Sequence, residues 1–320
     1  MMNNKLLLLI LFSTTANALS FNEVSRRSFA QSLSRTCGVI AGMVVPTQLI
    51  SQGAGASIAS DVRPFCVVGA NGKTGTKCVQ ELIGMGIPVR ATSRSGVYNE
   101  GIDSNPLLSP MVCDVTKLDT IQSSIEGTRA VIFAASASKG GGTPAQVDND
   151  GLVNVAKACI AAKIPHLVVV SSGSVTKPES PVFKFLNLFG KIMEEKIKGE
   201  DEVRRLYSTV EGATYTIIRP GGLTEDPGRG ASALELNQGD AKSGRISRFD
   251  VAALCIEATY YPQLTGRTTF ECYDADTGKS LNSVGASNIL KQKSDPGDFR
   301  TGYERNGETF EKLFTGLSKD

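Results

Sequence analysis

The sequence has no tryptophan and a single histidine, His166, among its 320 residues. A site that needs two imidazole ligands, such as a zinc protease motif or a Cys2His2 finger, is therefore excluded. None of the seven cysteines forms a Cys-x-x-Cys pair, and several stand inside apolar runs, such as Cys66 in FCVVG and Cys159 in AKACIAA. Such cysteines are typical of buried, reduced thiols. We expect neither a metal centre nor a disulfide framework.

An excess of charge of one sign is also missing. The chain carries 34 Lys and Arg against 32 Asp and Glu, a formal net charge of +2. Residues 1–60 hold four basic residues and one acid, Glu23, so they carry +3 and leave about −1 for the rest. Residues 61–320, called the body of the protein below, carry no excess positive charge and therefore have no general attraction to nucleic acid. The 41% of apolar residues is enough for a hydrophobic core, which excludes disorder throughout.

The first 60 residues have the features of a targeting leader. A short basic start, the apolar run Leu6–Phe12 and small residues around Ala18 match a secretory signal peptide, and the run is too short to span a bilayer. Residues 22–36 are rich in Ser and Arg and contain one acid, as transit peptides do. In this arrangement the leader resembles the bipartite plastid-targeting leaders of algae with secondary plastids.

A further targeting signal overlaps this leader. Arg26 and Arg27 stand in the sequence SRRSF, which matches the twin-arginine pattern, and the apolar stretch Cys37–Ile50 follows. This combination indicates delivery to the thylakoid lumen. The alternative is that the arginines are ordinary transit-peptide charge and that residues 37–50, interrupted by Pro46, form a weak anchor or spacer. We expect a plastid (chloroplast) protein of the stroma or the thylakoid lumen.

A change of pattern at Arg63 opens the body of the protein. The apolar run Phe65–Val68 predicts a strand, the sequence GANGKTG over 69–75 a glycine turn, and Thr76–Met85 a helix. Strand, glycine turn and helix in this order are the context of a dinucleotide fingerprint, in which glycines permit a sharp turn, close approach of the pyrophosphate and helix packing. The helix N-terminus then faces the phosphates. The alternative is a glycine-rich turn without a ligand.

The end of the second predicted strand, within Ile87–Ser95, indicates which dinucleotide is bound. An NAD site commonly has an acid about 20 residues after the glycine turn, where it binds the ribose 2′-hydroxyl. No Asp or Glu occurs between Glu81 and Glu100, and Arg94, flanked by two serines, occupies the expected position. A guanidinium suits a 2′-phosphate. We therefore expect NADP(H) as the cofactor, the alternative for Arg94 being a solvated loop cation.

Strand and helix patterns alternate along the rest of the body. We expect further strands at 112–115, 130–135, 167–170, 215–218 and 268–273 and helices at 118–125, 147–162, 182–206 and 250–260. Apolar strands separated by helices predict a single doubly wound α/β domain of the Rossmann type, with a parallel sheet covered on both faces. The expected organisation is a leader over 1–60, a nucleotide-binding domain over 61–275 with a small C-terminal substrate lobe, and a polar extension over 276–320.

Ligands of such sheets bind beyond the carboxyl ends of the strands. The residues expected at this crevice are Asp114, Ala135, Ser136, Ser171, Ser172, Pro220 and Gly221. His166 stands at the opposite, amino end of its predicted strand. We therefore interpret it as a structural or solvent-facing histidine, and a Ser-His-Asp hydrolase would lack its base.

Five segments, VVGANGKTG, CDV, VIFAAS, HLVVVSSGSV and YTIIRPGGL, follow one another within residues 64–274. In this order and spacing they resemble the short-chain dehydrogenase/reductase superfamily, and more narrowly its atypical, NAD(P)H-binding, NmrA-like branch. The resemblance implies that the pyrophosphate is held by Gly69, Asn71, Gly72, Lys73, Thr74 and Gly75. It further implies 2′-phosphate contacts at Arg94, adenine contacts at Asp114 and Val115, ribose contacts at Ala135 and Ser136, and nicotinamide contacts at Pro220, Gly221 and Gly222.

Catalysis is where the sequence departs from this superfamily. Typical members use Tyr-x-x-x-Lys, in which the lysine lowers the pKa of the tyrosine that donates a proton. No tyrosine here is followed four residues later by lysine. Lys198, followed by Gly-Glu, best matches the family lysine, which puts Glu194 in the place of the tyrosine. Ser171 and Ser172 end a strand where the family's catalytic serine sits. The plainer alternatives are a solvated helix charge for Lys198 and strand-end hydrogen bonding for the serines.

The sequence favours an NADP(H)-dependent oxidoreductase that transfers hydride to an electron-poor small molecule, because transfer to a ring such as a flavin needs mainly proximity and orientation. The alternative is a non-catalytic cofactor-sensing or assembly protein. The apolar segment from Phe183 to Phe189 is interpreted as core packing or, alternatively, as a lid, an oligomer contact or a contact with a thylakoid membrane surface. Within the polar residues 276–320, apolar residues recur at helical spacing from Phe310 to Leu317. This spacing predicts one helix that docks against the domain.

Overall fold

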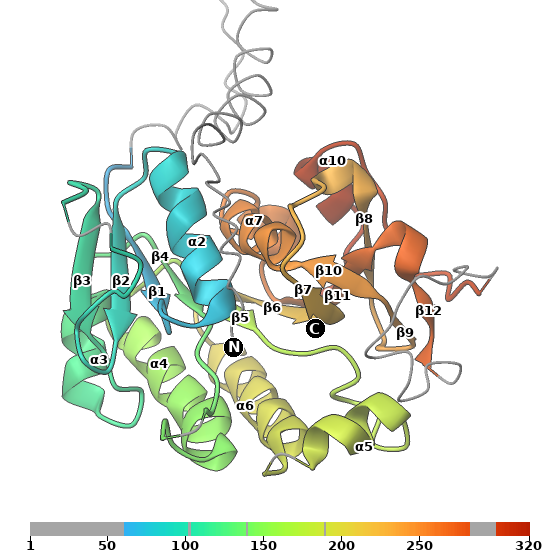
Figure 1. The fold of residues 1–320 in the computed structure, drawn as a ribbon, viewed down its shortest axis with the longest axis horizontal. Coiled ribbons are helices and arrows are strands. Elements are labelled where there is room, and N and C mark those ends of the chain that lie inside the picture. Colours follow the sequence, from blue (N-terminus) through green and yellow to red (C-terminus); the bar gives the residue numbers. More distant parts are fainter. Residues whose placement is uncertain (1–60, 102–103, 139, 189, 282–298) are drawn as a thin grey trace, which may run out of the picture. The chain divides into compact units, whose positions relative to one another are not determined.

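The computed structural model describes residues 61–320 except 102–103, 139, 189 and 282–298. The expected leader over 1–60, with its targeting signals, lies outside the described residues. Strands and helices alternate from residue 65 onward (Figure 1). None of the helices in the described part of the chain is long and apolar enough to cross a membrane.

Among the described residues, eight strands form one sheet, in the order β3, β2, β1, β4, β5, β6, β11, β8. They are β1 (Phe65–Val68), β2 (Val89–Ser93), β3 (Leu108–Val112), β4 (Ala130–Phe133), β5 (His166–Val170), β6 (Thr214–Pro220), β8 (Leu234–Asn237) and β11 (Thr268–Asp274). The pairs from β3 to β11 are all parallel, and β1, β4 and β5 are buried along their whole length. Central parallel strands need apolar side chains on both faces, which explains their continuous apolar runs.

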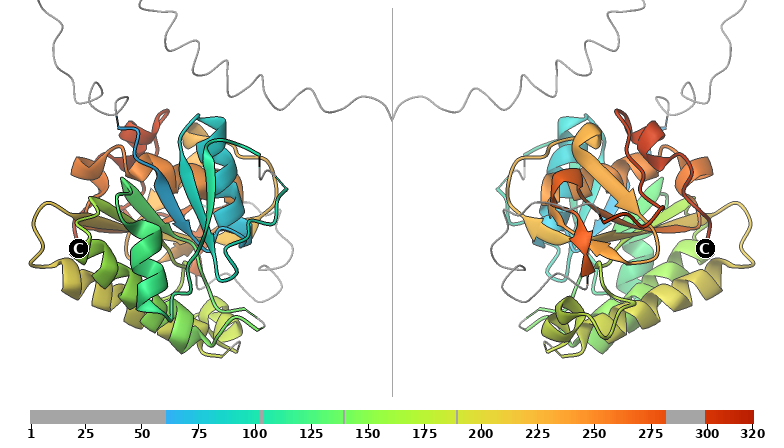
Figure 2. Two further views of the ribbon diagram at one scale, coloured as in Figure 1. Left: turned by 90° about the vertical axis from the view of Figure 1, so that its left-hand side faces the viewer. Right: turned by 90° about the vertical axis from the view of Figure 1, so that its right-hand side faces the viewer.

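Helices cover both faces of this sheet (Figure 2). One layer consists of α2 (Lys73–Gly84) and α7 (Arg248–Ala258), and the other of α3 (Leu118–Ile125), α4 (Asp150–Ala161) and α6 (Ile192–Tyr207). Alternate residues of β1 enter the two layers. Phe65 and Val67 join the core cluster that includes α2 and α7, and Cys66 and Val68 join the cluster that includes α4 and α6. The predicted doubly wound α/β fold is confirmed.

The helix expected over 182–206 is two helices in the structure. A short helix, α5 (Pro181–Asn187), is capped by the Ser180 hydroxyl, and α6 begins at Ile192. Between them Gly190 and Lys191 adopt φ angles of 76° and 64°, a left-handed conformation that ends a helix. The expected helix over 147–162 begins slightly earlier than predicted, with a π-helical turn at Ala145–Asn149 before α4.

The sheet is not wholly parallel, because the polar segment over 225–247 contributes a strand that the sequence did not indicate. This strand, β8, pairs antiparallel with β11 at the edge of the sheet, as is common in doubly wound folds. The surrounding small lobe contains β7 (Gly222–Thr224), β9 (Lys242–Ser243), β10 (Arg245–Ser247), β12 (Lys279–Ser280) and two 3-10 turns, Ala231–Ala233 and Ala275–Thr277. Here β7 pairs with β10, and β9 with β12. The short helix α8 (Pro262–Thr265) packs instead at the start of β6.

The C-terminal residues dock against the domain. Helix α10 (Phe310–Phe314) places Leu313 and Phe314 in the core cluster of α7, so the expected docking helix is present. The backbone N–H of Asp320 donates to the carbonyl of Arg267 just before β11. Burial of these apolar side chains stabilises the edge of the sheet.

The six described cysteines are buried and free, as their apolar surroundings predict. His166 is the first residue of β5 and is buried, with Nε2 2.8 Å from the hydroxyl of Thr216. Burial lowers the pKa of His166 to about 3, because the charged imidazolium loses its hydration. His166 is therefore a neutral structural histidine at the amino end of the sheet, away from the carboxyl-end crevice.

Candidate functional site

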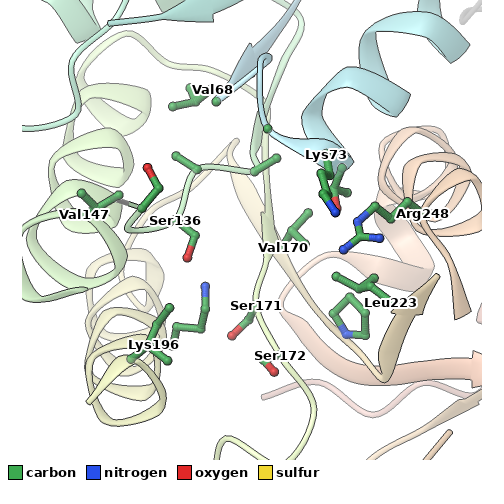
Figure 3. A pocket seen from close by; sticks show the side chains of 18 of the residues that line it. Val68, Lys73, Ser136, Val147, Val170, Ser171, Ser172, Lys196, Leu223 and Arg248 are labelled. Carbon is green, nitrogen blue, oxygen red and sulfur yellow. The ribbon is translucent and has the colours of Figure 1, made fainter. Parts of the chain in front are cut away.

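A cavity of about 1290 Å³ opens at the carboxyl ends of the parallel strands (Figure 3). This volume exceeds the roughly 300–1,000 Å³ of typical small-ligand sites, so it suits a ligand larger than one small molecule. All predicted site residues line the cavity except Gly75 and Lys198. In the described part of the chain, no cluster of three or more His, Cys, Asp or Glu side chains is placed to hold a metal ion.

The glycine turn after β1 is shaped by close backbone contacts. Gly69 has a φ of +84°, and a Cβ atom there would lie 2.7 Å from the Cα of Ala135. Its carbonyl accepts a hydrogen bond of 2.9 Å from the N–H of Gly72. Gly75 does not line the cavity and packs against the turn, where a Cβ at its position would collide with the carbonyl oxygen of Gly69. Gly75 therefore lets α2 pack beneath the turn, as the fingerprint predicts.

The N-terminus of α2 is an open anion site. Its N-cap, Gly72, supplies no side-chain hydrogen bond, and its first turn contains no acidic residue. The first amides of a helix have no intrahelical partner and carry partial positive charge, so the N–H groups of Lys73 and Thr74 suit a phosphate. The exposed ammonium of Lys73 lies 3.5 Å from the carboxylate of Glu225 in the small lobe. These residues fit the pyrophosphate of a dinucleotide.

Asn71 holds the glycine turn against the loop after β2. Its Nδ2 donates to the carbonyl of Val97 at 2.8 Å, and its Oδ1 accepts from the N–H of Asn99 at 2.9 Å. These two bonds satisfy polar atoms of both loops. Asn71 thus fixes the distance between the turn and the tip of β2.

Arg94 lies at the tip of β2, on the wall of the cavity. Its Nη1 donates to the carbonyl of Gly140 at 2.7 Å, which ties the tip to the loop after β4. A guanidinium has five N–H donors, so this bond leaves donors for a phosphate. The hydroxyls of Ser93 and Ser95 are 3.3 Å apart beside it. The position fits a 2′-phosphate, and Asp114 and Val115 line the neighbouring wall.

Three side chains from different elements meet at the cavity, where Ser136 and Lys196 line the wall and Asp148 is buried behind them. The hydroxyl of Ser136 donates to Asp148 Oδ1 at 2.6 Å, and the Lys196 ammonium lies 2.7 Å from the same oxygen. Asp148 Oδ2 accepts from the N–H of Ala137 at 2.9 Å. Asp148 comes from the π-helical turn. Lys196 comes from α6 and reaches into the cavity (Figure 3). The sequence reasoning missed both residues.

The structure brings Lys196, and not Lys198, to the cavity. Lys198 is exposed and bonds Glu195 at 2.6 Å, away from the cavity. The inner face of α6 carries buried residues at helical spacing, namely Met193, Glu200, Val203 and Tyr207, and Lys196 falls within this stripe. Helical periodicity therefore points to Lys196. Four residues before Lys196 stands Ile192, which lines the cavity and has no proton to donate. With Lys196 as the cavity lysine, Ile192 and not Glu194 corresponds to the tyrosine of the superfamily.

The two predicted serines follow β5 and differ in their partners. Ser171 donates its hydroxyl proton to Glu200, which is fully buried on α6. The guanidinium of Arg219 binds the same carboxylate, with Nη2 2.6 Å from Oε2. Ser172 donates to the carbonyl of Gly173 at 3.1 Å. The sequence reasoning missed Glu200, which lies four residues after Lys196 on the inner stripe of α6.

The rest of the cavity lining is mainly apolar and basic. It includes Val182, Leu186, Ile192, Met193 and Leu223 together with Arg245 and Arg248. Of the apolar segment noted in the sequence, Phe183 packs in a small core with Val175 and Met193, whereas Leu188 is 78% exposed. Phe189 lies outside the described residues. Phe183 is therefore a packing residue, and Leu186 forms part of the cavity wall. A lid, an oligomer contact or a membrane-surface contact by this segment stays a prediction.

Comparisons with known proteins agree with this geometry. The chain is 33% identical over 202 residues to an uncharacterized chloroplast protein of Arabidopsis thaliana, covering 60% of this chain and 70% of that protein. It is 29% identical over 222 residues to the chloroplast protein TIC 62 of Pisum sativum, covering 62% of this chain but only 40% of TIC 62. A putative NAD-dependent epimerase/dehydratase from Bacillus halodurans superposes with a TM-score of 0.55 at 25% identity, covering 68% of this chain and 96% of that one. Residues 69–262 match the NAD(P)H-binding family, to which this chain belongs.

Proposed function

We propose that the protein binds NADP(H) in preference to NAD(H) and transfers hydride between this cofactor and an electron-poor small molecule. The observation that carries the proposal is the pairing of an open helix N-terminus at α2 with Arg94 at the tip of β2, both of which line the same cavity. The helix amides suit a pyrophosphate. The guanidinium suits a further phosphate, which a carboxylate at the same place would repel.

The residues around the reacting end set the chemistry. The bound nicotinamide supplies or accepts the hydride. Pro220 and Gly221 form the wall expected at the nicotinamide, and Lys196, with one of its three N–H donors directed to Asp148, has donors left for a ribose hydroxyl or substrate oxygen. Because Ile192 occupies the place of the tyrosine, no side chain there donates a proton. This favours an acceptor that needs orientation more than acid catalysis.

A second candidate is a cofactor-sensing or assembly protein that binds the nucleotide without turnover. Ile192 favours it, since the cavity keeps its nucleotide residues while the usual proton donor is missing. Nucleic acid is not a proposed partner, because the body carries a net charge of about −1. We further propose a plastid location, supported by the leader pattern and by the two relatives named as chloroplast proteins. A fluorescent fusion of residues 1–60 tests this location.

The deciding experiment is a calorimetric titration of the purified protein with NADPH and with NADH, followed by a screen of quinones, flavins and tetrapyrroles for oxidation of the reduced cofactor. Tighter binding of NADPH with turnover of one acceptor class supports the oxidoreductase. Binding without turnover of any acceptor supports the sensing or assembly protein. Absence of binding by either nucleotide contradicts both.

A further inference from the structure

The hydroxyl protons of three cavity serines are all directed into the protein. Ser171 donates to Glu200, Ser136 donates to Asp148, and Ser172 donates to the carbonyl of Gly173. A serine hydroxyl has one proton and two acceptor lone pairs. When the proton is engaged inside the protein, only the lone pairs can serve a ligand. This row of serines therefore presents hydrogen-bond acceptors to the cavity.

Glu200 determines that the hydroxyl of Ser171 acts as an acceptor toward the cavity. The glutamate is fully buried, and its oxygens accept Nη2 of Arg219 at 2.6 Å and Nη2 of Arg204 at 2.9 Å. Arginine is always charged and only donates, so the carboxylate between two guanidiniums is an acceptor. The proton shared by Ser171 and Glu200 therefore belongs to the serine. In this geometry Ser171 cannot donate to a carbonyl group of a ligand.

Ser171 lies beside the wall expected at the nicotinamide ring. Its N–H donates to the carbonyl of Ile218 at 2.8 Å, and the N–H of Gly173 donates to the carbonyl of Pro220 at 2.8 Å. Residues 171–173 thus run alongside the end of β6, which continues into Gly221. At this end a nicotinamide dinucleotide carries donors in its ribose hydroxyls and in its carboxamide, and the carboxamide amino group is the donor attached to the ring itself. The acceptor lone pairs of Ser171 match that donor.

We propose that Ser171 accepts a hydrogen bond from the carboxamide amino group of the nicotinamide ring and that Glu200 is the positioning residue that makes it an acceptor. This inference rests on the proposed function. It assigns to Ser171 recognition of the cofactor in place of proton donation to a substrate. It also gives the buried Glu200–Arg219 pair a role in ligand selectivity, beyond its contribution to packing α6 on β6.

The test compares NADP⁺ with its 3-acetylpyridine analogue, in which a methyl group replaces the amino group and the carbonyl oxygen stays. Calorimetry of the full chain measures both affinities, so no turnover is needed. We expect wild-type protein to prefer NADP⁺ by about three- to tenfold, the value of one hydrogen bond. Ser171→Ala loses the preference, and Ser171→Thr, which keeps a hydroxyl, retains it. Ser208→Ala, at the exposed end of α6, is the control for the effects of a serine substitution on protein preparation and folding.

Glu200→Gln provides the second variant. The glutamine oxygen faces the arginines and its amino group faces Ser171, so the serine accepts from the protein and turns its proton to the cavity. We expect Glu200→Gln to lose the preference for NADP⁺, as Ser171→Ala does. If Glu200→Gln does not fold, the Ser171→Ala measurement decides the test. Equal binding of the two nucleotides by wild type, or a preference that survives in Ser171→Ala, overturns this inference alone. Absence of binding of either nucleotide to wild type overturns the proposed function with it.

Discussion

Ile192 stands one helical turn before Lys196 on α6, and both residues line the cavity. Residues four apart on a helix lie on the same face, so the pair reproduces the spacing of Tyr-x-x-x-Lys with an apolar side chain in the first position. The lysine is held by Asp148 at 2.7 Å. The cavity therefore contains the lysine of the usual Tyr-x-x-x-Lys pair but lacks the tyrosine that donates the proton.

Replacing Ile192 by tyrosine should install the missing donor. The phenol of Ile192→Tyr would lie one turn from the Lys196 ammonium, which favours the phenolate and so lowers the tyrosine pKa. General acid catalysis contributes about 100-fold or more. We expect NADPH-dependent reduction of a small diketone to rise by about that factor over wild type, measured by loss of NADPH absorbance.

Glu194→Tyr is the matched control, because it creates the same spacing with Lys198. Lys198 is exposed, bonds Glu195 and does not line the cavity. We therefore expect no gain in diketone reduction from Glu194→Tyr. Equal gains in the two variants would contradict the assignment of Lys196 as the lysine of the cavity.

Arg94→Gln should reduce the preference for NADPH. Hydrogen bonds to a charged group contribute about 1.5–3 kcal/mol, so removing the guanidinium weakens NADPH binding by about tenfold or more and leaves NADH binding nearly unchanged. The difference between the two nucleotides should also shrink at high salt in wild type. Arg90→Gln, on the same strand, is the control. Arg90 binds the carbonyls of Ser124 and Glu126, so its loss should lower stability without changing the preference.

Local patterns in the sequence predicted the glycine turn, the tip of β2 and the strand ends, because each depends on neighbouring residues alone. The roles of Lys196 and Asp148 could not be predicted in the same way. They depend on which face of α6 turns inward and on the π-helical turn before α4, both of which are set by packing between helices. Strand β8 was missed for a similar reason, since its pairing with β11 joins residues far apart in a segment rich in glycine and polar residues.

The buried Glu271 on β11 should make stability fall as pH rises. Burial and the nearby charge of Asp240 raise the pKa of Glu271 to about 8, although Arg219 opposes the shift. A carboxyl whose pKa is higher in the folded state holds a proton that the unfolded chain has already lost. The unfolding free energy therefore decreases between about pH 4.5 and pH 8, by at most about 1.4 kcal/mol per unit.

Urea unfolding at pH 6 and pH 8 measures this effect, with Glu271→Gln as the variant that cannot titrate. Wild type should lose more unfolding free energy between the two pH values than Glu271→Gln does, by about 2 kcal/mol at most. Glu308→Gln removes an exposed carboxylate and should keep the wild-type slope. An equal loss in wild type and Glu271→Gln would contradict a protonated Glu271 in the fold.

Two glycines of α2 should respond in opposite ways to the same substitution. At Gly75 a Cβ would collide with the carbonyl oxygen of Gly69, whereas at Gly84 it would meet no atom of the described residues within 4 Å. Gly75→Ala should therefore lower the unfolding free energy by about 1–3 kcal/mol through overpacking and weaken nucleotide binding by shifting the turn. Gly84→Ala should raise the unfolding free energy by a few tenths to about 1 kcal/mol through helix propensity and leave binding unchanged. Urea unfolding and calorimetry of the pair check this, and wild-type binding by Gly75→Ala would show that the turn does not need the tight packing of α2 beneath it.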